Sequence, residues 1–123
     1  MKDQELKDNL QFEDETEGII FNHYSFCEII KHIMVQYGNI TYQEADKKLK
    51  NHFLYKEPKS LDDIYYITRE LEFHWAMLIA HGHMYWLKGI PSDFNEFKEE
   101  YLAWEDEVRK KYNLKESYNY YDI

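Results

Sequence analysis

Four residues near the middle of the chain have side chains and a spacing that would suit metal binding or acid–base catalysis. They are Glu70, His74, Met77 and His81. On an α-helix, where successive residues turn by about 100°, all four fall within about 60° of one another. A carboxylate and two imidazoles aligned in this way could bind zinc or iron, or act as a general acid and base. His83 would join His81 at one cavity if the helix opened at Gly82.

The spacing of these residues departs from the established motifs for such chemistry. The sequence contains neither His-Glu-x-x-His nor the paired Glu-x-x-His of di-iron bundles. His74 and His81 are two helical turns apart, so one ion would reach both only if the helix bent. We therefore interpret the histidines as hydrogen-bonded groups within a helical bundle and expect no cofactor. A metal site formed by Glu70, His74, His81 and His83 is the alternative.

The other reactive side chains form no catalytic pattern. Cys27 shares one helical face with Ile30 and Met34, which predicts an inert thiol in the core. Glu28 and His32 are four residues apart and predict an exposed contact on a helix surface. No serine lies in a nucleophile-elbow context, and the sequence has no glycine-rich phosphate loop. We therefore expect a protein that is not an enzyme.

Helical periodicity predicts the elements that would hold these residues. Apolar residues recur every three or four positions over residues 22–37, 42–53, 61–85 and 92–112. The third stretch is long for one globular helix, so we expect a kink near Glu72. Residues 73–80 are apolar nearly all round, which places them at the centre of the structure. Because no alternating pattern of useful length is present, the sequence predicts an all-α fold, a four-to-five-helix bundle with a long central helix.

Capping signals mark the ends of these helices. They are Gly38 and Asn39 after the first helix, Thr41 with Glu44 before the second, Ser60 before the third and Ser92 before the last. They divide the chain into an acidic N-terminal segment (1–18), flexible or docked as a short helix, a helical bundle domain (19–112) and a tyrosine-rich C-terminal tail (113–123). We expect the tail to be irregular.

Composition and charge narrow the functional class. The 123-residue chain carries a net charge of −9, which disfavours nucleic acid and anionic lipid as partners. It has a single cysteine and a polar N-terminal stretch, and no apolar run approaches the roughly 20 residues that a membrane span needs. These features predict a cytoplasmic protein that binds neither nucleic acid nor membrane.

Two surfaces are typical of protein recognition. One is an acidic ridge on the last helix, formed by Glu96, Glu99, Glu100, Asp106 and Glu107. The other consists of Tyr118, Tyr120 and Tyr121 in the tail. Acidic residues would steer a basic protein partner, and tyrosines would supply contact area at low entropic cost. The plainer interpretation is a solvated helix face and rings that dock back onto the bundle. A homodimer formed along residues 61–85 is a further interpretation.

In size, acidity, helix content and aromatic richness, the chain resembles the small immunity proteins of bacterial toxin–immunity systems. The resemblance covers the whole chain in character and involves no motif, so no site residue is carried over from it. It implies a protein that binds a cognate toxin and blocks its active site or an exosite. Phage-encoded inhibitors of host defence share the same acidic character.

Charge, tyrosines and resemblance together predict a non-enzymatic inhibitor or adaptor that binds a basic protein, an immunity protein neutralising a cognate toxin. The alternatives are a metal- or small-molecule-binding helical protein centred on His74, His81 and His83, or a phage-type inhibitor of host defence.

Overall fold

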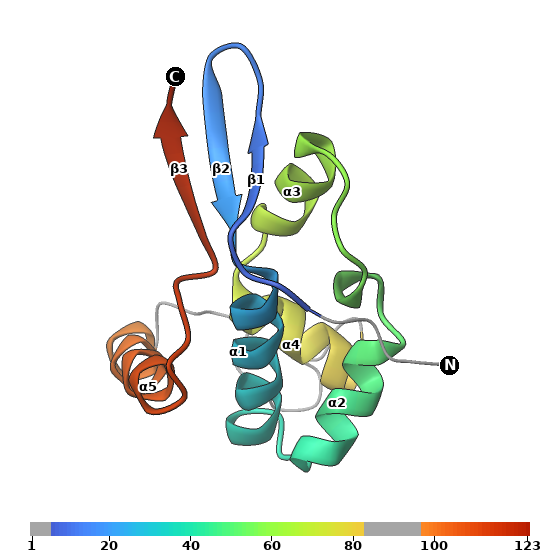
Figure 1. The fold of residues 1–123 in the computed structure, drawn as a ribbon. Coiled ribbons are helices and arrows are strands. Elements are labelled where there is room, and N and C mark those ends of the chain that lie inside the picture. Colours follow the sequence, from blue (N-terminus) through green and yellow to red (C-terminus); the bar gives the residue numbers. More distant parts are fainter. Residues whose placement is uncertain (1–5, 83–96) are drawn as a thin grey trace.

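The computed structural model describes residues 6–82 and 97–123, and within them the fold is mixed α/β (Figure 1). Its elements are, in chain order, β1 (Leu10–Glu13), β2 (Glu17–Phe21), α1 (His23–Gln36), α2 (Tyr42–Lys50), the short 3₁₀ helix η1 (Phe53–Tyr55), α3 (Leu61–Thr68), α4 (Glu72–His81), α5 (Lys98–Lys111) and β3 (Tyr118–Asp122). The prediction of an all-α fold was therefore wrong.

An antiparallel sheet with the strand order β1-β2-β3 is the feature that the periodicity missed. Asp14 closes the β1–β2 hairpin, since its backbone N–H donates to the carbonyl of Glu17 at 2.9 Å. β3 then pairs with β2 across most of the chain, Glu17 opposite Asp122 and Phe21 opposite Tyr118. The acidic N-terminal segment and the tyrosine-rich tail thus contribute strands to one sheet, and the tail is not irregular.

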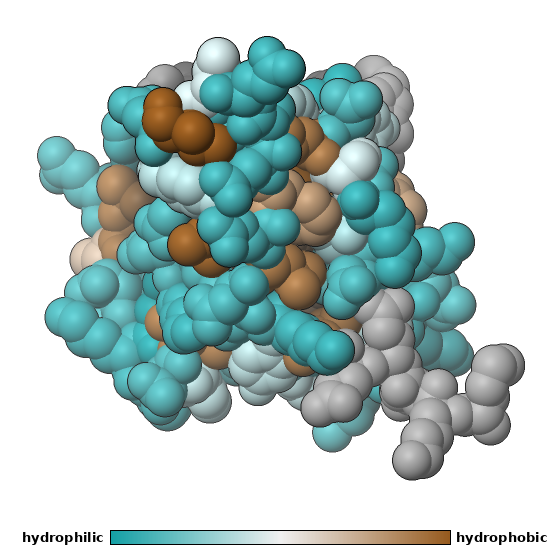
Figure 2. All heavy atoms as spheres, turned by 45° about the horizontal axis from the view of Figure 1, so that its top comes forward, coloured by the Kyte–Doolittle hydropathy of each residue, from teal (hydrophilic) through white to brown (hydrophobic). Residues whose placement is uncertain are grey.

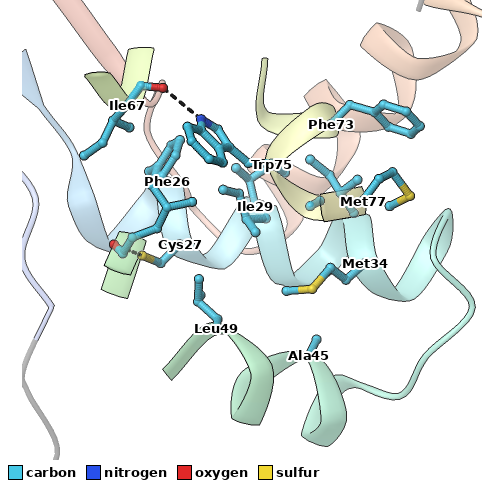
Figure 3. Close-up of a cluster of buried hydrophobic side chains, with 14 of the residues drawn as sticks. Phe26, Cys27, Ile29, Met34, Ala45, Leu49, Ile67, Phe73, Trp75 and Met77 are labelled. Carbon is cyan, nitrogen blue, oxygen red and sulfur yellow. Dashed lines mark hydrogen bonds between the residues drawn. The ribbon is translucent and has the colours of Figure 1, made fainter. Parts of the chain in front are cut away.

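The long central helix is also absent, because α3 and α4 are separate helices. Leu71 adopts an extended conformation and caps the N-terminus of α4, close to the kink expected near Glu72. The break frees the carbonyl of Ile67, which a continuous helix would pair with the backbone of Leu71. The indole N–H of Trp75 donates to this carbonyl at 2.8 Å instead, as Figure 3 shows. One buried side chain therefore compensates for the helix break.

The first helix and its neighbours follow the predicted pattern. α1 lies between α2, α4 and α5, and the sheet rises from these helices with α3 beside it (Figure 1). Two caps are confirmed: the backbone N–H of Glu44 donates to Thr41 Oγ1 at 3.1 Å, and that of Asp63 donates to Ser60 Oγ at 3.3 Å. The expected cap at Ser92 lies outside the described residues.

The core forms where α1 meets α4, as predicted for residues 73–80. The fully buried side chains there include Phe26, Ile29, Met34 and Met77 (Figure 3). Cys27 is buried in the same cluster, and this burial raises the pKa of its thiol well above the usual range. Among the described residues there is no helix with the length and apolar character that crossing a bilayer requires.

Candidate functional site

The turn between β1 and β2 places an acidic group at one end of the sheet. The side chain of Asp14 accepts hydrogen bonds from the backbone N–H groups of Thr16 and Glu17, both at 2.8 Å. These two bonds lower the pKa of Asp14 and fix the turn. We call the result the acidic sheet end, formed by Glu13, Asp14, Glu15, Glu17 and Asp122.

The negative charge of the acidic sheet end is not compensated locally. Among residues 6–82 and 97–123, none of its five carboxylates forms an ion pair with a lysine, arginine or histidine. Figure 2 brings this end of the molecule forward and shows hydrophilic side chains with separate hydrophobic ones between them. An uncompensated group of this kind attracts cationic surfaces over about a Debye length of 8 Å.

Tyrosines from α3 and β3 border the acidic sheet end on both faces of the sheet. On the inner face, the hydroxyl of Tyr65 donates to the Glu17 carboxylate, which raises the pKa of Tyr65 to about 12. On the same face Tyr120 is 51% exposed, and its hydroxyl lies 3.2 Å from Thr68 Oγ1. Carboxylates and partly exposed rings are therefore neighbours here.

On the outer face of the sheet the ring of Tyr121 lies over Gly18. A Cβ atom at position 18 would be 2.3 Å from this ring, so the glycine makes room for the tyrosine. The Tyr121 hydroxyl accepts a hydrogen bond from Gln11 Nε2 at 2.6 Å. The third predicted tyrosine, Tyr118, is half-buried against the core. The sequence-based prediction grouped three tyrosines as exposed anchors, whereas only Tyr120 is an exposed ring.

The acidic ridge on α5 is a separate surface. Glu99, Glu100, Asp106 and Glu107 are exposed on this helix, and Asp106 pairs with Lys110 at 2.9 Å. Glu96 lies outside the described residues. Figure 1 places α5 at the opposite end of β3 from the acidic sheet end. The structure thus does not join the ridge to the tyrosines as one surface, and a different acidic group borders Tyr120.

The histidines proposed as metal ligands have separate partners. His74 Nε2 lies 3.8 Å from Glu70 Oε2, one turn away on the chain. His81 Nε2 lies 2.7 Å from the carbonyl oxygen of Gly38, at the end of α1. Within the described residues no group of three or more His, Cys, Asp or Glu side chains is arranged to hold a metal ion. His83, the fourth ligand of that alternative, lies outside these residues.

A buried charge network links α4, α5 and the segment before β3. Arg109 is 6% exposed and lies 3.2 Å from Glu105 and 3.8 Å from Glu72. It also donates to the hydroxyl of Ser117 at 3.3 Å and to the backbone carbonyl of Lys115. Burial, and then the charge of Glu105, raise the pKa of Glu72 to about 7. The i,i+4 spacing of Glu105 and Arg109 was the available sequence signal, but it does not indicate burial.

A second polar cluster joins α1 to α2. Glu28 was predicted to be an exposed helix-surface residue, but its side chain is only 14% exposed and its carboxylate lies 2.7 Å from the buried Lys31 amine. The hydroxyl of Tyr42 donates to the same carboxylate at 3.0 Å. His32 stacks on the ring of Tyr112, with ring centroids 4.4 Å apart. Because Glu28 is already bonded to a cation and a hydroxyl, its role is to hold the two helices together.

An aromatic groove of about 800 Å³ opens between η1 and α3. Phe53 and Tyr66, which are 43% and 47% exposed, line it, and the ring of each packs against the buried Trp75. Pro58 and Ile67 add further apolar surface, and the guanidinium of Arg69 stacks on the Tyr66 ring at 4.2 Å. The helical periodicity over residues 42–53 places Phe53 at the end of the apolar face of the second helix, where it would be buried. The chain instead leaves α2 before this residue, which exposes the ring.

Comparison of the chain with protein-family models, with curated proteins and with solved structures found no match. The geometry of the described residues is therefore what supports a function.

Proposed function

We propose that this chain is a non-enzymatic inhibitor or adaptor that binds a basic protein through the acidic sheet end and the tyrosines beside it. The observation that carries the proposal is that five carboxylates, none of them in an ion pair within residues 6–82 and 97–123, share one end of the sheet with the exposed Tyr120. If the resemblance to small acidic immunity proteins extends to function, the partner is a cognate toxin, and binding blocks its active site or an exosite.

The two components of this surface have different roles in binding. Clustered charge of one sign raises the rate of association with an oppositely charged partner by roughly 10–1,000-fold at low salt. The tyrosines supply rigid apolar area that, once buried, slows dissociation. The acidic sheet end is held by the hairpin turn and by the β2–β3 ladder, so little ordering is needed on binding.

The test starts by co-expressing the chain with the product of its neighbouring gene and measuring both complex formation and relief of toxicity. A variant that combines Glu13→Gln, Glu15→Gln and Asp122→Asn then removes three charges from the acidic sheet end and leaves the turn-forming Asp14 in place. We expect this variant to associate at least tenfold more slowly at low salt.

A matched control places the same charge change on the acidic ridge. The variant with Glu99→Gln, Glu100→Gln and Glu107→Gln has the same net charge as the sheet-end variant, so any long-range effect of total charge is equal in both. The proposal requires the sheet-end variant to be the slower of the two. Equal rates would show that total charge alone steers the partner, and the absence of any stable protein partner would reject the proposed function.

The aromatic groove favours a second function, the binding of an apolar small molecule. A groove of this size lies in the range of ligand pockets, and exposed rings above a buried tryptophan are typical of their walls. Binding there would change the fluorescence of Trp75, and Phe53→Ala would weaken the response because it removes one wall. A response that is unchanged in this variant would exclude the groove as the site.

A further inference from the structure

We infer that the basic partner binds by adding an extended segment to the sheet as a fourth strand along β3. This inference rests on the proposed function and specifies how the same surface would be recognised. It is carried by the orientation of the β3 backbone, by a run of four uncharged residues on a strand edge that no other described strand covers, and by the negative charge at the end of that strand.

The hydrogen bonds at the two ends of β3 determine which of its backbone groups are free. The carbonyl of Ser117 accepts from the N–H of Asn22 at 2.8 Å, and the N–H of Ile123 donates to the carbonyl of Thr16 at 3.1 Å. In an antiparallel ladder the residues that point towards a given neighbour alternate. Ser117, Asn119, Tyr121 and Ile123 therefore point their backbone groups towards β2, whereas Tyr118, Tyr120 and Asp122 point theirs outwards.

The outer edge of β3 is open within the described part of the chain. The sheet ends at β3, so the N–H and carbonyl groups of Tyr118, Tyr120 and Asp122 have no strand beside them. Natural proteins block such edges with charged side chains, lysine above all, with proline, with a bulge or by keeping the strand short. The five-residue sequence Tyr-Asn-Tyr-Tyr-Asp contains neither lysine nor proline, and its register with β2 runs without a bulge from Tyr118 to Asp122. Its one charged residue, Asp122, would repel an acidic strand and attract a basic one.

Charge determines which kind of strand suits this edge. Asp122 lies on β3 itself and faces Glu17 across the ladder. Of the remaining carboxylates of the acidic sheet end, Asp14 and Glu15 lie in the β1–β2 turn and Glu13 ends β1. A basic segment would compensate these charges as it paired. A second copy of this chain would instead bring a further net charge of −9 to the same interface, which opposes self-pairing.

The side chains of β3 leave room for those of an added strand. Tyr120 and Asp122 are exposed on the inner face of the sheet, and Asn119 is exposed on the outer face. Alternate residues of the incoming strand would therefore meet a tyrosine and a carboxylate on one face and an amide on the other. Backbone pairing would supply affinity, and these contacts would supply specificity.

The probe for this inference is a capped peptide of seven alternating lysine and valine residues, titrated into the isotope-labelled full chain and followed by NMR. We expect the amide signals of Tyr118, Tyr120 and Asp122 to shift, and their hydrogen exchange to slow, as the peptide pairs with them. A second peptide has the same sequence, but the backbone nitrogens of alternate residues are methylated, namely those that would face β3. It keeps the charge, cannot donate those hydrogen bonds, and should bind at least tenfold more weakly.

Two variants isolate the backbone contribution from the protein side. Tyr120→Pro removes one outward N–H together with the ring, whereas Tyr120→Ala removes the ring alone. We expect Tyr120→Pro to bind the peptide about fivefold more weakly than Tyr120→Ala, since one backbone hydrogen bond separates them. Should the proline variant fail to fold, the pair of peptides still provides the same comparison.

The results separate this inference from the proposed function. Equal affinities for the methylated and unmethylated peptides would overturn strand addition. In that case the variant with three neutralised carboxylates at the acidic sheet end could still associate more slowly with the protein partner. The proposed function would then stand, and only strand addition along β3 would be rejected. A mass near twice 15.2 kDa by light scattering, with the β3 amides already protected before peptide is added, would show that a second copy occupies the edge and would also overturn the inference.

Discussion

Replacing Glu72 with glutamine should change how the stability of this protein depends on pH. Glu72 is the first residue of α4, and its side chain is 18% exposed. It lies 3.8 Å from Arg109 Nη2, the nitrogen that also contacts Glu105 at 3.2 Å. Burial and the neighbouring carboxylate raise its pKa from 4.5 to about 7 in the folded protein. Glutamine keeps the shape of the side chain and removes the ionisation.

The sign and size of the effect follow from linkage. Between pH 4.5 and 7 the folded protein holds a proton on Glu72 that the unfolded chain has already lost, so this group stabilises the fold at low pH. That stabilisation disappears as the pH rises through 7. A rise in the pKa of Glu72 from 4.5 to about 7 corresponds to about 3 kcal/mol in the free energy of unfolding, because each pKa unit is worth about 1.4 kcal/mol.

Urea unfolding of both proteins from pH 4.5 to 8.5 would measure this effect as a difference. Burial lowers the pKa values of His23, His32 and His52, so these groups reduce stability as the pH falls below 6.5, against the trend from Glu72. Their contribution is present in both proteins and cancels in the difference. The stability of Glu72→Gln relative to the parent should therefore rise with pH until about 7 and then level off.

Glu99→Gln provides the control, because it makes the same chemical change on the exposed face of α5. Its unfolding free energy should follow that of the parent at every pH. If the curve for Glu72→Gln also ran parallel to the parent curve between pH 5 and 8, the buried carboxylate would not be protonated in the native state. The account of the Arg109 network would then be wrong.

Three further substitutions test other parts of the fold, each by urea unfolding at neutral pH. Arg109→Met should lower the free energy of unfolding by about 3–5 kcal/mol, since it leaves the half-buried Glu105 carboxylate without its cation and removes the bonds to Lys115 and Ser117. Gly18→Ala should lower the free energy of unfolding by about 1 kcal/mol, because the new Cβ displaces the Tyr121 ring from its hydrogen bond to Gln11. The double variant with Tyr121→Ala should lose less stability than the two single variants together, since the ring that the Cβ displaces is then gone. Thr41→Ala should cost about 1 kcal/mol by removing the N-cap of α2, and an unchanged midpoint would contradict the capping box.

Local signals explain which parts of the fold could be predicted from the sequence. Neighbours a few positions apart determine the limits of α1, the caps at Thr41 and Ser60, and the central place of residues 73–80. A helix is defined by such contacts, so periodicity and capping residues suffice to find it. The sequence predicted only a kink where α3 and α4 are in fact separate helices. The full break depends on the hydrogen bond from the Trp75 indole to the free carbonyl of Ile67, which helical periodicity does not reveal.

The sheet could not be predicted in this way. β1 has four residues and β2 and β3 have five each, too short for an alternating pattern to stand out. The pairing of Glu17 with Asp122 joins residues at opposite ends of the chain, which no local pattern encodes. The candidate site was missed for the same reason, because the hairpin carboxylates and Tyr120 become neighbours only when the sheet forms.

The distance along the chain between β2 and β3 also has a kinetic consequence. Closing a loop of about a hundred residues costs conformational entropy that the local helices do not have to supply, so we expect the helices to form first and the sheet to close last. Until β3 docks, the apolar strand that contains Ile19 and Phe21 lacks its partner on one side. We therefore expect a chain in which β3 has not yet docked to expose this edge of β2 to aggregation, and docking of β3 to cover it.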